Sequence, residues 1–98
     1  MINDKKILII VPAYNEGAII FQTVSDIKRL HPQYPVLVIN DGASDDTAVQ
    51  ATLAKAFVIS HPYNLGIGGA IQTGFKYAHK NQFDIVVEMD GDAQHDPR

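Results

Sequence analysis

The chain has 98 residues, 46% of them hydrophobic and 19% charged, which suffices for one compact domain and is too short for a second. Eleven Asp and Glu against eight Lys and Arg give a net charge of −3, and without any basic run this excludes the electrostatic footprint of a nucleic-acid-binding protein. The absence of Cys excludes disulfides and thiolate zinc sites.

The first two elements are predicted to be a strand and a helix. The run Ile7–Val11 is apolar throughout and is followed by Pro12, as in a strand that is covered on both faces. Asn15 is a favourable N-cap, and apolar residues recur beyond it at helical spacing until Pro32 and Pro35. The inner face of this helix is expected to comprise Ile20, Val24, Ile27 and Leu30 or His31.

The next unit repeats this order. Val36–Ile39 is a second buried strand, and Ser44 is predicted to cap a short helix that carries Val49 and Leu53. Ala56–Ile59 is predicted as the third strand.

The last elements are a helix and a strand. The glycine-rich stretch 66–69 is predicted to form a flexible turn, and a third helix follows it to about Asn81. Its inner face is expected to comprise Ile71, Phe75 and Ala78, and Ile85–Met89 is the fourth strand.

The predicted order is β-α-β-α-β-α-β with strands that are apolar throughout. This favours an α/β fold, a Rossmann-like parallel sheet with right-handed crossovers and helices on both faces. Ligands of such sheets bind beyond the carboxyl ends of the strands, so the residues that follow each strand are the candidates for a site.

Three of these candidates have two interpretations each. Asp41 with Gly42 either forms a simple turn or places a carboxylate that accepts from the N–H groups of a nucleobase. Tyr14 is either a half-exposed aromatic residue or a stacking surface for that base. Glu16 either complements a helix dipole, the interpretation with more weight, or belongs to the site.

The glycines Gly66, Gly68 and Gly69 leave a similar choice. Residues without Cβ let a backbone approach a pyrophosphate at a helix N-terminus, but they also permit close packing at a tight turn. The dinucleotide fingerprint G-x-G-x-x-G is not met, because position 71 is Ile.

Acidic residues follow the fourth strand. Asp90 and Asp92 flank a glycine and can face one point, and Gln94 can add a carbonyl oxygen. Hard oxygen ligands of this kind suit Mg²⁺ or Mn²⁺, and such an ion can bridge two phosphates. The same pattern also occurs in turns and helix caps.

Four segments in this order resemble the family 2 glycosyltransferases. They are Val11–Glu16, Val38–Thr47, Asn64–Ala70 and Met89–Pro97, and the resemblance covers almost the full chain. Asp90 to His95 is most similar to the branch that moves mannose or glucose from a nucleotide sugar to a polyprenyl phosphate, as the dolichyl-phosphate mannose synthases do. Asp96 departs from the proline that is frequent in that branch.

The resemblance implies a GT-A type fold and a role for particular residues. It implies that Asp41 reads the base, and that Asp90 and Asp92 with Gln94 engage the cation and the diphosphate. The nucleotide pocket would be lined by Pro12, Ala13, Tyr14 and Glu16, and Gly68 is added from the glycine pattern. The implied reaction is metal-assisted, inverting transfer of a hexose from a GDP- or UDP-sugar to an acceptor, with polyprenyl phosphate at a membrane surface as the expected acceptor.

Residues 1–98 are thus expected to be the nucleotide-sugar-binding part of a glycosyltransferase domain without its acceptor-binding half. The general base is expected beyond Arg98, and the isolated segment is expected to be inactive and to self-associate through an edge strand and an uncovered apolar face. The longest apolar run, Ile7–Val11, is far below the roughly 20 residues of a membrane helix, and we expect a cytoplasmic protein that is peripheral to the membrane at full length.

Two other functions are compatible with parts of the pattern. A non-catalytic nucleotide-binding or assembly module would use Asp41 and the glycines without any turnover. A haloacid dehalogenase-like phosphatase also places Asp-x-Asp after an apolar strand, but it expects Thr or Val where this chain has Gln94 and has the motif near its N-terminus.

Overall fold

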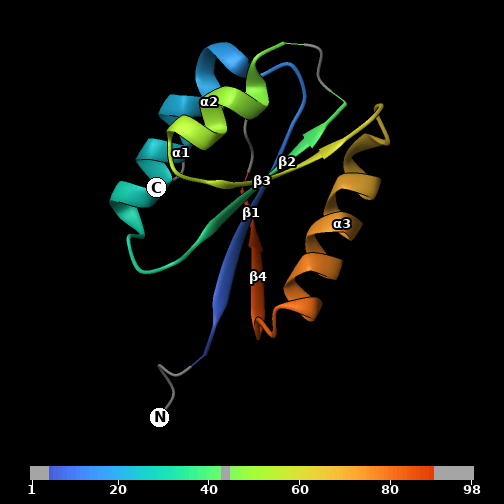
Figure 1. Ribbon diagram of the computed structural model, residues 1–98. Coiled ribbons are helices and arrows are strands. Elements are labelled where there is room, and N and C mark those ends of the chain that lie inside the picture. The colour runs from blue at the N-terminus through green and yellow to red at the C-terminus, as the bar shows by residue number, and fades with distance from the viewer. Residues whose placement is uncertain (1–4, 43–44, 90–98) are drawn as a thin grey trace.

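The computed structural model describes residues 5–42 and 45–89, shown in colour in Figure 1. Strands and helices alternate along the chain as predicted. They are β1 (Ile7–Ala13), α1 (Gly17–Leu30), β2 (Val36–Asp41), α2 (Thr47–Leu53), β3 (Phe57–His61), α3 (Gly66–Lys80) and β4 (Ile85–Glu88).

The strands form a single parallel sheet in the order β3-β2-β1-β4. Val11 is level with Val38 of β2, and Ile39 is level with Ile59 of β3. Because all the strands run in one direction, their carboxyl ends lie at the same edge of the sheet. The predicted Rossmann-like α/β fold is therefore confirmed.

Helices cover the sheet on both faces, with α1 and α2 on one side and α3 on the other (Figure 1). The alternation of side chains along β1 divides the core accordingly. Ile9 and Val11 pack with the buried residues of α1 and α2, whereas Leu8 and Ile10 pack with those of α3. Both faces of the central strands are therefore buried, which explains their unbroken apolar sequences.

Strand β1 runs two residues further than predicted, through Pro12 to Ala13. Pro12 is level with Ile39 of β2, whereas the pairing of β1 with β4 ends at Ile10 and Glu88. Beyond that point β1 has a described neighbour on one side only. A proline, which cannot donate to a ladder, is tolerated at such an edge position.

The predicted inner face of α3 is wrong in part. Phe75 is 53% exposed, and the buried residues of the helix are Ala70, Gly74 and Ala78. The helix lies so close to β1 that a Cβ at Gly74 would stand 2.8 Å from Cδ1 of Ile10. The small residues therefore face the sheet, and the larger apolar residue one position away points outward.

The other helices add two details. Helix α2 carries Val49 and Leu53 as predicted; both are exposed, and Thr47 and Ala51 form its buried face. Asn15 is not the N-cap of α1: it has a left-handed φ of 52°, and Glu16 occupies the cap position. The predicted cap Ser44 of α2 lies outside the described residues.

Candidate functional site

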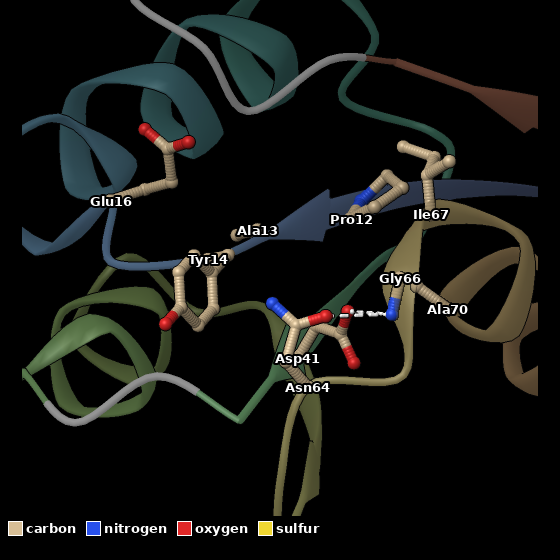
Figure 2. Close-up of a pocket in the computed structure, with 9 residues that line it drawn as sticks. All are labelled: Pro12, Ala13, Tyr14, Glu16, Asp41, Asn64, Gly66, Ile67 and Ala70. Carbon is tan, nitrogen blue, oxygen red and sulfur yellow. Dashed lines mark hydrogen bonds between the residues drawn. The ribbon is translucent and has the colours of Figure 1, made fainter.

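A pocket of about 200 Å³ opens at the carboxyl edge of the sheet (Figure 2). The turn between β1 and α1 supplies one wall, the end of β2 supplies Asp41, and the segment that leads into α3 supplies the remainder. Its lining comprises Pro12, Ala13, Tyr14, Glu16, Asp41, Asn64, Gly66, Ile67 and Ala70. Five of these lining residues were expected from the sequence to bind the nucleotide, and they lie around one cavity: Pro12, Ala13, Tyr14, Glu16 and Asp41.

The β1–α1 turn is held in place by the start of α2. The backbone N–H of Glu16 donates to Oγ1 of Thr47 at 3.0 Å, and the N–H of Gly17 donates to Oδ2 of Asp45 at 3.0 Å. Asp45 also accepts from the N–H and from the hydroxyl of Thr47. The N-cap residue Glu16 makes no side-chain cap hydrogen bond, and Asp45 and Thr47 satisfy donors at the N-terminus of α1 from another loop.

These bonds also affect the charge of Asp45. The hydrogen bond from the Thr47 side chain lowers the pKa of the Asp45 carboxyl below its ordinary value, and the N–H groups of Gly17 and Thr47 add to this effect against a smaller desolvation effect. Asp45 is therefore a carboxylate near neutral pH, the form that accepts from all of these donors.

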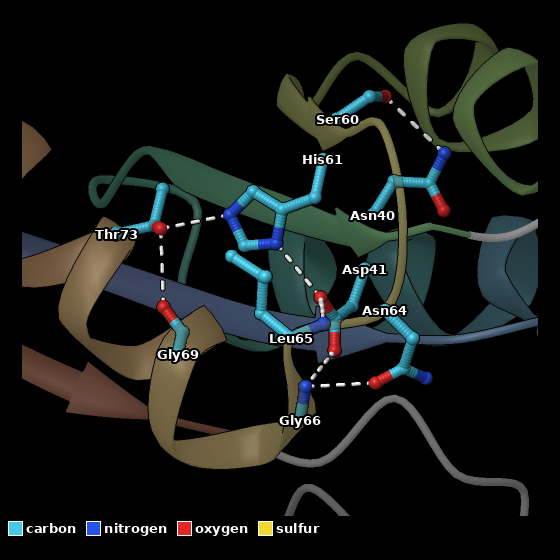
Figure 3. Close-up of polar contacts among 9 residues, drawn as sticks. All are labelled: Asn40, Asp41, Ser60, His61, Asn64, Leu65, Gly66, Gly69 and Thr73. Atoms are coloured by element: carbon cyan, nitrogen blue, oxygen red, sulfur yellow. Dashed lines mark hydrogen bonds and ion pairs between the residues drawn. The ribbon is translucent and has the colours of Figure 1, made fainter.

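Asp41 lines the pocket, and its carboxylate accepts several hydrogen bonds from the protein itself. The N–H groups of Leu65 and Gly66 donate to Oδ1 and Oδ2, each at 2.9 Å, and Nδ1 of His61 lies 2.7 Å from Oδ1 (Figure 3). Leu65 and Gly66 begin α3, so Asp41 caps that helix from a neighbouring strand. Asp41 is thus more than a turn residue.

The pKa of the Asp41 carboxyl is lowered by this environment. Burial acts to raise it, but the hydrogen bonds from His61, Leu65 and Gly66 and the charge interaction with His61 together outweigh burial. Asp41 is consequently ionised at neutral pH even though its side chain is only 7% exposed.

His61 follows the third predicted strand, where site residues are expected, but nothing in the sequence marks it as a ligand, and a solvated or packing role was expected for it. Its side chain is 8% exposed, and its Nε2 lies 2.8 Å from Oγ1 of Thr73 on α3 (Figure 3). His61 ends β3 and is level with Asp41 at the end of β2. The position of both residues at the ends of adjacent strands was the available signal.

The glycines do not form the turn that the sequence predicted, because α3 already begins at Gly66. Gly66 lines the pocket with a left-handed φ of 84°, and its N–H is shared between Asp41 and Oδ1 of Asn64. Gly68 lies in the first turn of α3, is exposed, and is not among the lining residues. A Cβ at Gly68 would meet no atom within 4 Å.

The predicted metal ligands Asp90, Asp92 and Gln94 lie outside the described residues. The described chain reaches Met89, whose N–H donates to the carbonyl of Ile10 at 2.9 Å, at the same edge as the pocket. Within residues 5–42 and 45–89, His, Asp and Glu do not form any group of three that could hold a metal ion. Across the same residues we find no helix that is both long and apolar enough to cross a membrane.

The model of the family described as "Glycosyl transferase family 2" matches residues 8–98. Among curated proteins, the chain is 33% identical to the UDP-N-acetylglucosamine--dolichyl-phosphate N-acetylglucosaminyltransferase of Methanococcus voltae, over 96% of this chain and 44% of that protein. It is 32% identical to the undecaprenyl-phosphate mannosyltransferase of Micrococcus luteus, over 94% of this chain and 40% of that protein. The chain therefore spans less than half the length of these relatives.

Solved structures show the same fold. Glucosyl-3-phosphoglycerate synthase from Mycobacterium tuberculosis, in complex with Mn²⁺, UDP-glucose and phosphoglyceric acid, superposes with a TM-score of 0.73 and 28% identity, over 92% of this chain and 34% of that chain. A complex of the same synthase with Mg²⁺ and UDP also gives a TM-score of 0.73. These likenesses confirm the expected GT-A type of fold.

Proposed function

This chain belongs to glycosyl transferase family 2, and we propose that it binds the nucleotide-diphosphate sugar of an enzyme that transfers a hexose to an acceptor. Residues 1–98 form the nucleotide-sugar-binding part of that enzyme's glycosyltransferase domain. The observation that carries this proposal is the pocket at the carboxyl edge of the sheet, where an ionised, buried Asp41 lies beside the half-exposed ring of Tyr14.

The pocket suits a nucleoside. The Tyr14 side chain is 47% exposed and offers a face on which a base can stack, while Pro12 and Ala13 supply apolar contacts. The Asp41 carboxylate accepts a hydrogen bond from an N–H group on the edge of that base. Glu16 lies in the same wall, beside the N-terminus of α1.

The diphosphate is proposed to lie between Gly68 and the segment after β4. Gly68 leaves open space in the first turn of α3, where N–H groups have no helical acceptor. Asp90, Asp92 and Gln94 are oxygen donors of the kind that hold Mg²⁺ or Mn²⁺. When bound, such an ion supplies positive charge that stabilises a departing diphosphate. The synthase neighbours, which were crystallised with Mn²⁺ or Mg²⁺ and UDP, support this assignment.

The acceptor is proposed to be a polyprenyl phosphate. Support comes from the relatives named as dolichyl-phosphate and undecaprenyl-phosphate transferases. With such an acceptor the full-length enzyme would work from the cytoplasm at the surface of the membrane. The general base that takes the acceptor's proton is proposed to lie beyond Arg98 in the full-length enzyme, which makes residues 1–98 inactive alone.

Calorimetric titration of UDP and GDP into the chain with Mn²⁺ tests the nucleotide site. We expect saturable binding, and we expect Tyr14→Ala and Asp41→Asn to weaken it, because one removes the stacking surface and the other the charged acceptor. Tyr63→Ala is a matched control, since Tyr63 is an exposed tyrosine that does not line the pocket. An affinity that is equal in wild type and in the first two variants would contradict the proposed site.

The two alternative functions give different outcomes. A non-catalytic nucleotide-binding module would bind nucleotide in the same titration, but the full-length protein would transfer no sugar to any acceptor. A haloacid dehalogenase-like phosphatase would hydrolyse p-nitrophenyl phosphate, an activity that the proposed glycosyltransferase lacks.

A further inference from the structure

We propose that this site selects a uridine diphosphate over a guanosine diphosphate, and that His61 is the positioning residue that enforces the choice. The proposal rests on the proposed nucleotide site and adds to it the identity of the base. It follows from how many hydrogen bonds the Asp41 carboxylate can still accept.

A carboxylate has two oxygens and about four acceptor positions. In Asp41, Oδ1 accepts from the N–H of Leu65 and from Nδ1 of His61, so both of its positions are filled. Among residues 5–42 and 45–89, Oδ2 accepts from the N–H of Gly66 alone, and with respect to these residues one position remains. Because Asp41 lines the pocket, that last position is the one available to a ligand.

The bases differ in what they would place against this acceptor. Uracil carries a single N–H on its pairing edge, between two carbonyl groups, and one acceptor satisfies it. Guanine carries adjacent ring N–H and amino groups, which a carboxylate binds with both oxygens. If Oδ1 is filled, one guanine donor is left unpaired in the pocket, and that costs affinity. Cytosine presents a lone pair at the corresponding ring nitrogen and is repelled by the carboxylate.

His61 keeps Oδ1 filled. A carboxylate only accepts, so the hydrogen of this contact is on Nδ1 of His61. On the other side of the ring, Nε2 lies 2.8 Å from the Thr73 hydroxyl oxygen, and this oxygen lies 3.1 Å from the carbonyl of Gly69 (Figure 3). The imidazole is buried between β2 and α3 and does not line the pocket, so it acts on a base only through Asp41.

Two substitutions separate the contacts of His61. Asn places its amide nitrogen near the position of Nδ1, so His61→Asn keeps a donor to Asp41 and loses the contact with Thr73. Gln places its amide nitrogen near the position of Nε2, so His61→Gln keeps the contact with Thr73. It frees the acceptor position of Oδ1 that His61 fills, while Leu65 keeps the other. Each variant loses one of the two ring contacts, which makes them matched controls for stability.

The test is calorimetric titration of UDP, GDP and CDP with Mn²⁺ into the wild-type chain and both variants, with melting temperatures measured in parallel. We expect wild type and His61→Asn to bind UDP on the order of tenfold more tightly than GDP, and His61→Gln to lose most of that preference. A purely structural role would lower the melting temperature without changing the ratio of the two affinities.

The outcomes distinguish this proposal from the proposed function. If GDP binds the wild-type chain as tightly as UDP, or if His61→Gln keeps the wild-type ratio, the base assignment is overturned while the nucleotide site stands. If none of the three nucleotides binds, the proposed function is overturned and this proposal with it. The wild-type comparison depends on neither variant, so it decides the base even if His61→Gln does not fold.

Discussion

Oδ2 of Asp45 accepts a hydrogen bond from the backbone N–H of Gly17 at 3.0 Å, although 28 residues separate them. The contact joins the loop after β2 to the loop after β1, and the second of these carries Tyr14 and Glu16 into the pocket. The shape of one pocket wall therefore depends on residues that do not line it.

Thr47 is the buried member of this connection, and its hydroxyl accepts from the N–H of Glu16. We expect Thr47→Val to lower the free energy of unfolding by about 1–3 kcal/mol, because it leaves that N–H without its acceptor at nearly unchanged volume. We also expect weaker nucleotide binding. Thr47→Ser keeps the hydroxyl and should keep the affinity. Urea denaturation and UDP titration of both variants check this, and equal affinities would show that the connection does not shape the pocket.

Gly42 packs against the backbone of the segment that leads into α3 and lines the pocket. Its φ is 78°, and a Cβ there would stand 2.4 Å from the backbone nitrogen of Asn64. We expect Gly42→Ala to lower the free energy of unfolding by at least about 2 kcal/mol, since both the left-handed conformation and the contact with backbone oppose it. Urea denaturation measures the loss. A variant as stable as wild type would mean that the segment leading into α3 can move without cost.

The variant Gly68→Ala distinguishes an effect on the stability of the chain from an effect on diphosphate binding. A Cβ there meets nothing within 4 Å, and alanine favours a helix over glycine by about 1 kcal/mol, so Gly68→Ala should be at least as stable as wild type. If the diphosphate approaches this turn, the variant binds UDP more weakly but uridine equally well. Titration with both ligands distinguishes the two, and unchanged UDP affinity would remove Gly68 from the site.

The lowered pKa of Asp41 predicts a pH dependence of stability. The pKa of Asp41 in the folded chain is below the ordinary value of 3.8. Its contribution to the free energy of unfolding is therefore complete above pH 3.8 and is lost as the pH falls through the folded pKa. Urea denaturation from about pH 6 to about pH 2 should show this loss. Asp41→Asn should flatten the profile and leave the slope that Asp45 contributes. Parallel profiles would show that Asp41 is not linked to folding in this way.

Exposed apolar residues on the outer strands predict self-association. Within the described sheet, β3 and β4 are the edges, and Phe57 of β3 is 58% exposed while Val87 of β4 is 37% exposed. Sedimentation velocity of the isolated chain should show larger species as concentration rises. Phe57→Lys with Val87→Lys should restore a monomer. A wild-type chain that stays monomeric at high concentration would rule the association out.

Much of the fold was predictable from the sequence, because strands buried on both faces are apolar throughout and the helices between them are not. The apolar runs at Ile7 and Val36 mark β1 and β2 directly. Where a helix packs closely on the sheet, the pattern fails. Gly74 allows α3 to approach Ile10. Because glycine has no side chain, a pattern of hydrophobic residues does not indicate that it lies on the inner face of the helix.

The site was predictable from position more than from chemistry. Parallel strands place Tyr14 and Asp41 at one edge, and both line the pocket. The partners of Asp41 were not predictable in the same way, because backbone donors from the start of α3 carry no side-chain signature. His61 could be found only from its register with Asp41.

The central claim is that a nucleoside diphosphate and a divalent ion bind this edge of the sheet together. The most direct test is the melting temperature of the chain with UDP alone, with Mn²⁺ alone, with both, and with UDP plus a chelator. We predict that UDP and Mn²⁺ together raise it far more than the sum of their separate effects, because each completes the coordination of the other, and that Asp92→Asn abolishes this synergy. If UDP raises the melting temperature equally with chelator present, or not at all with Mn²⁺, the claim is contradicted.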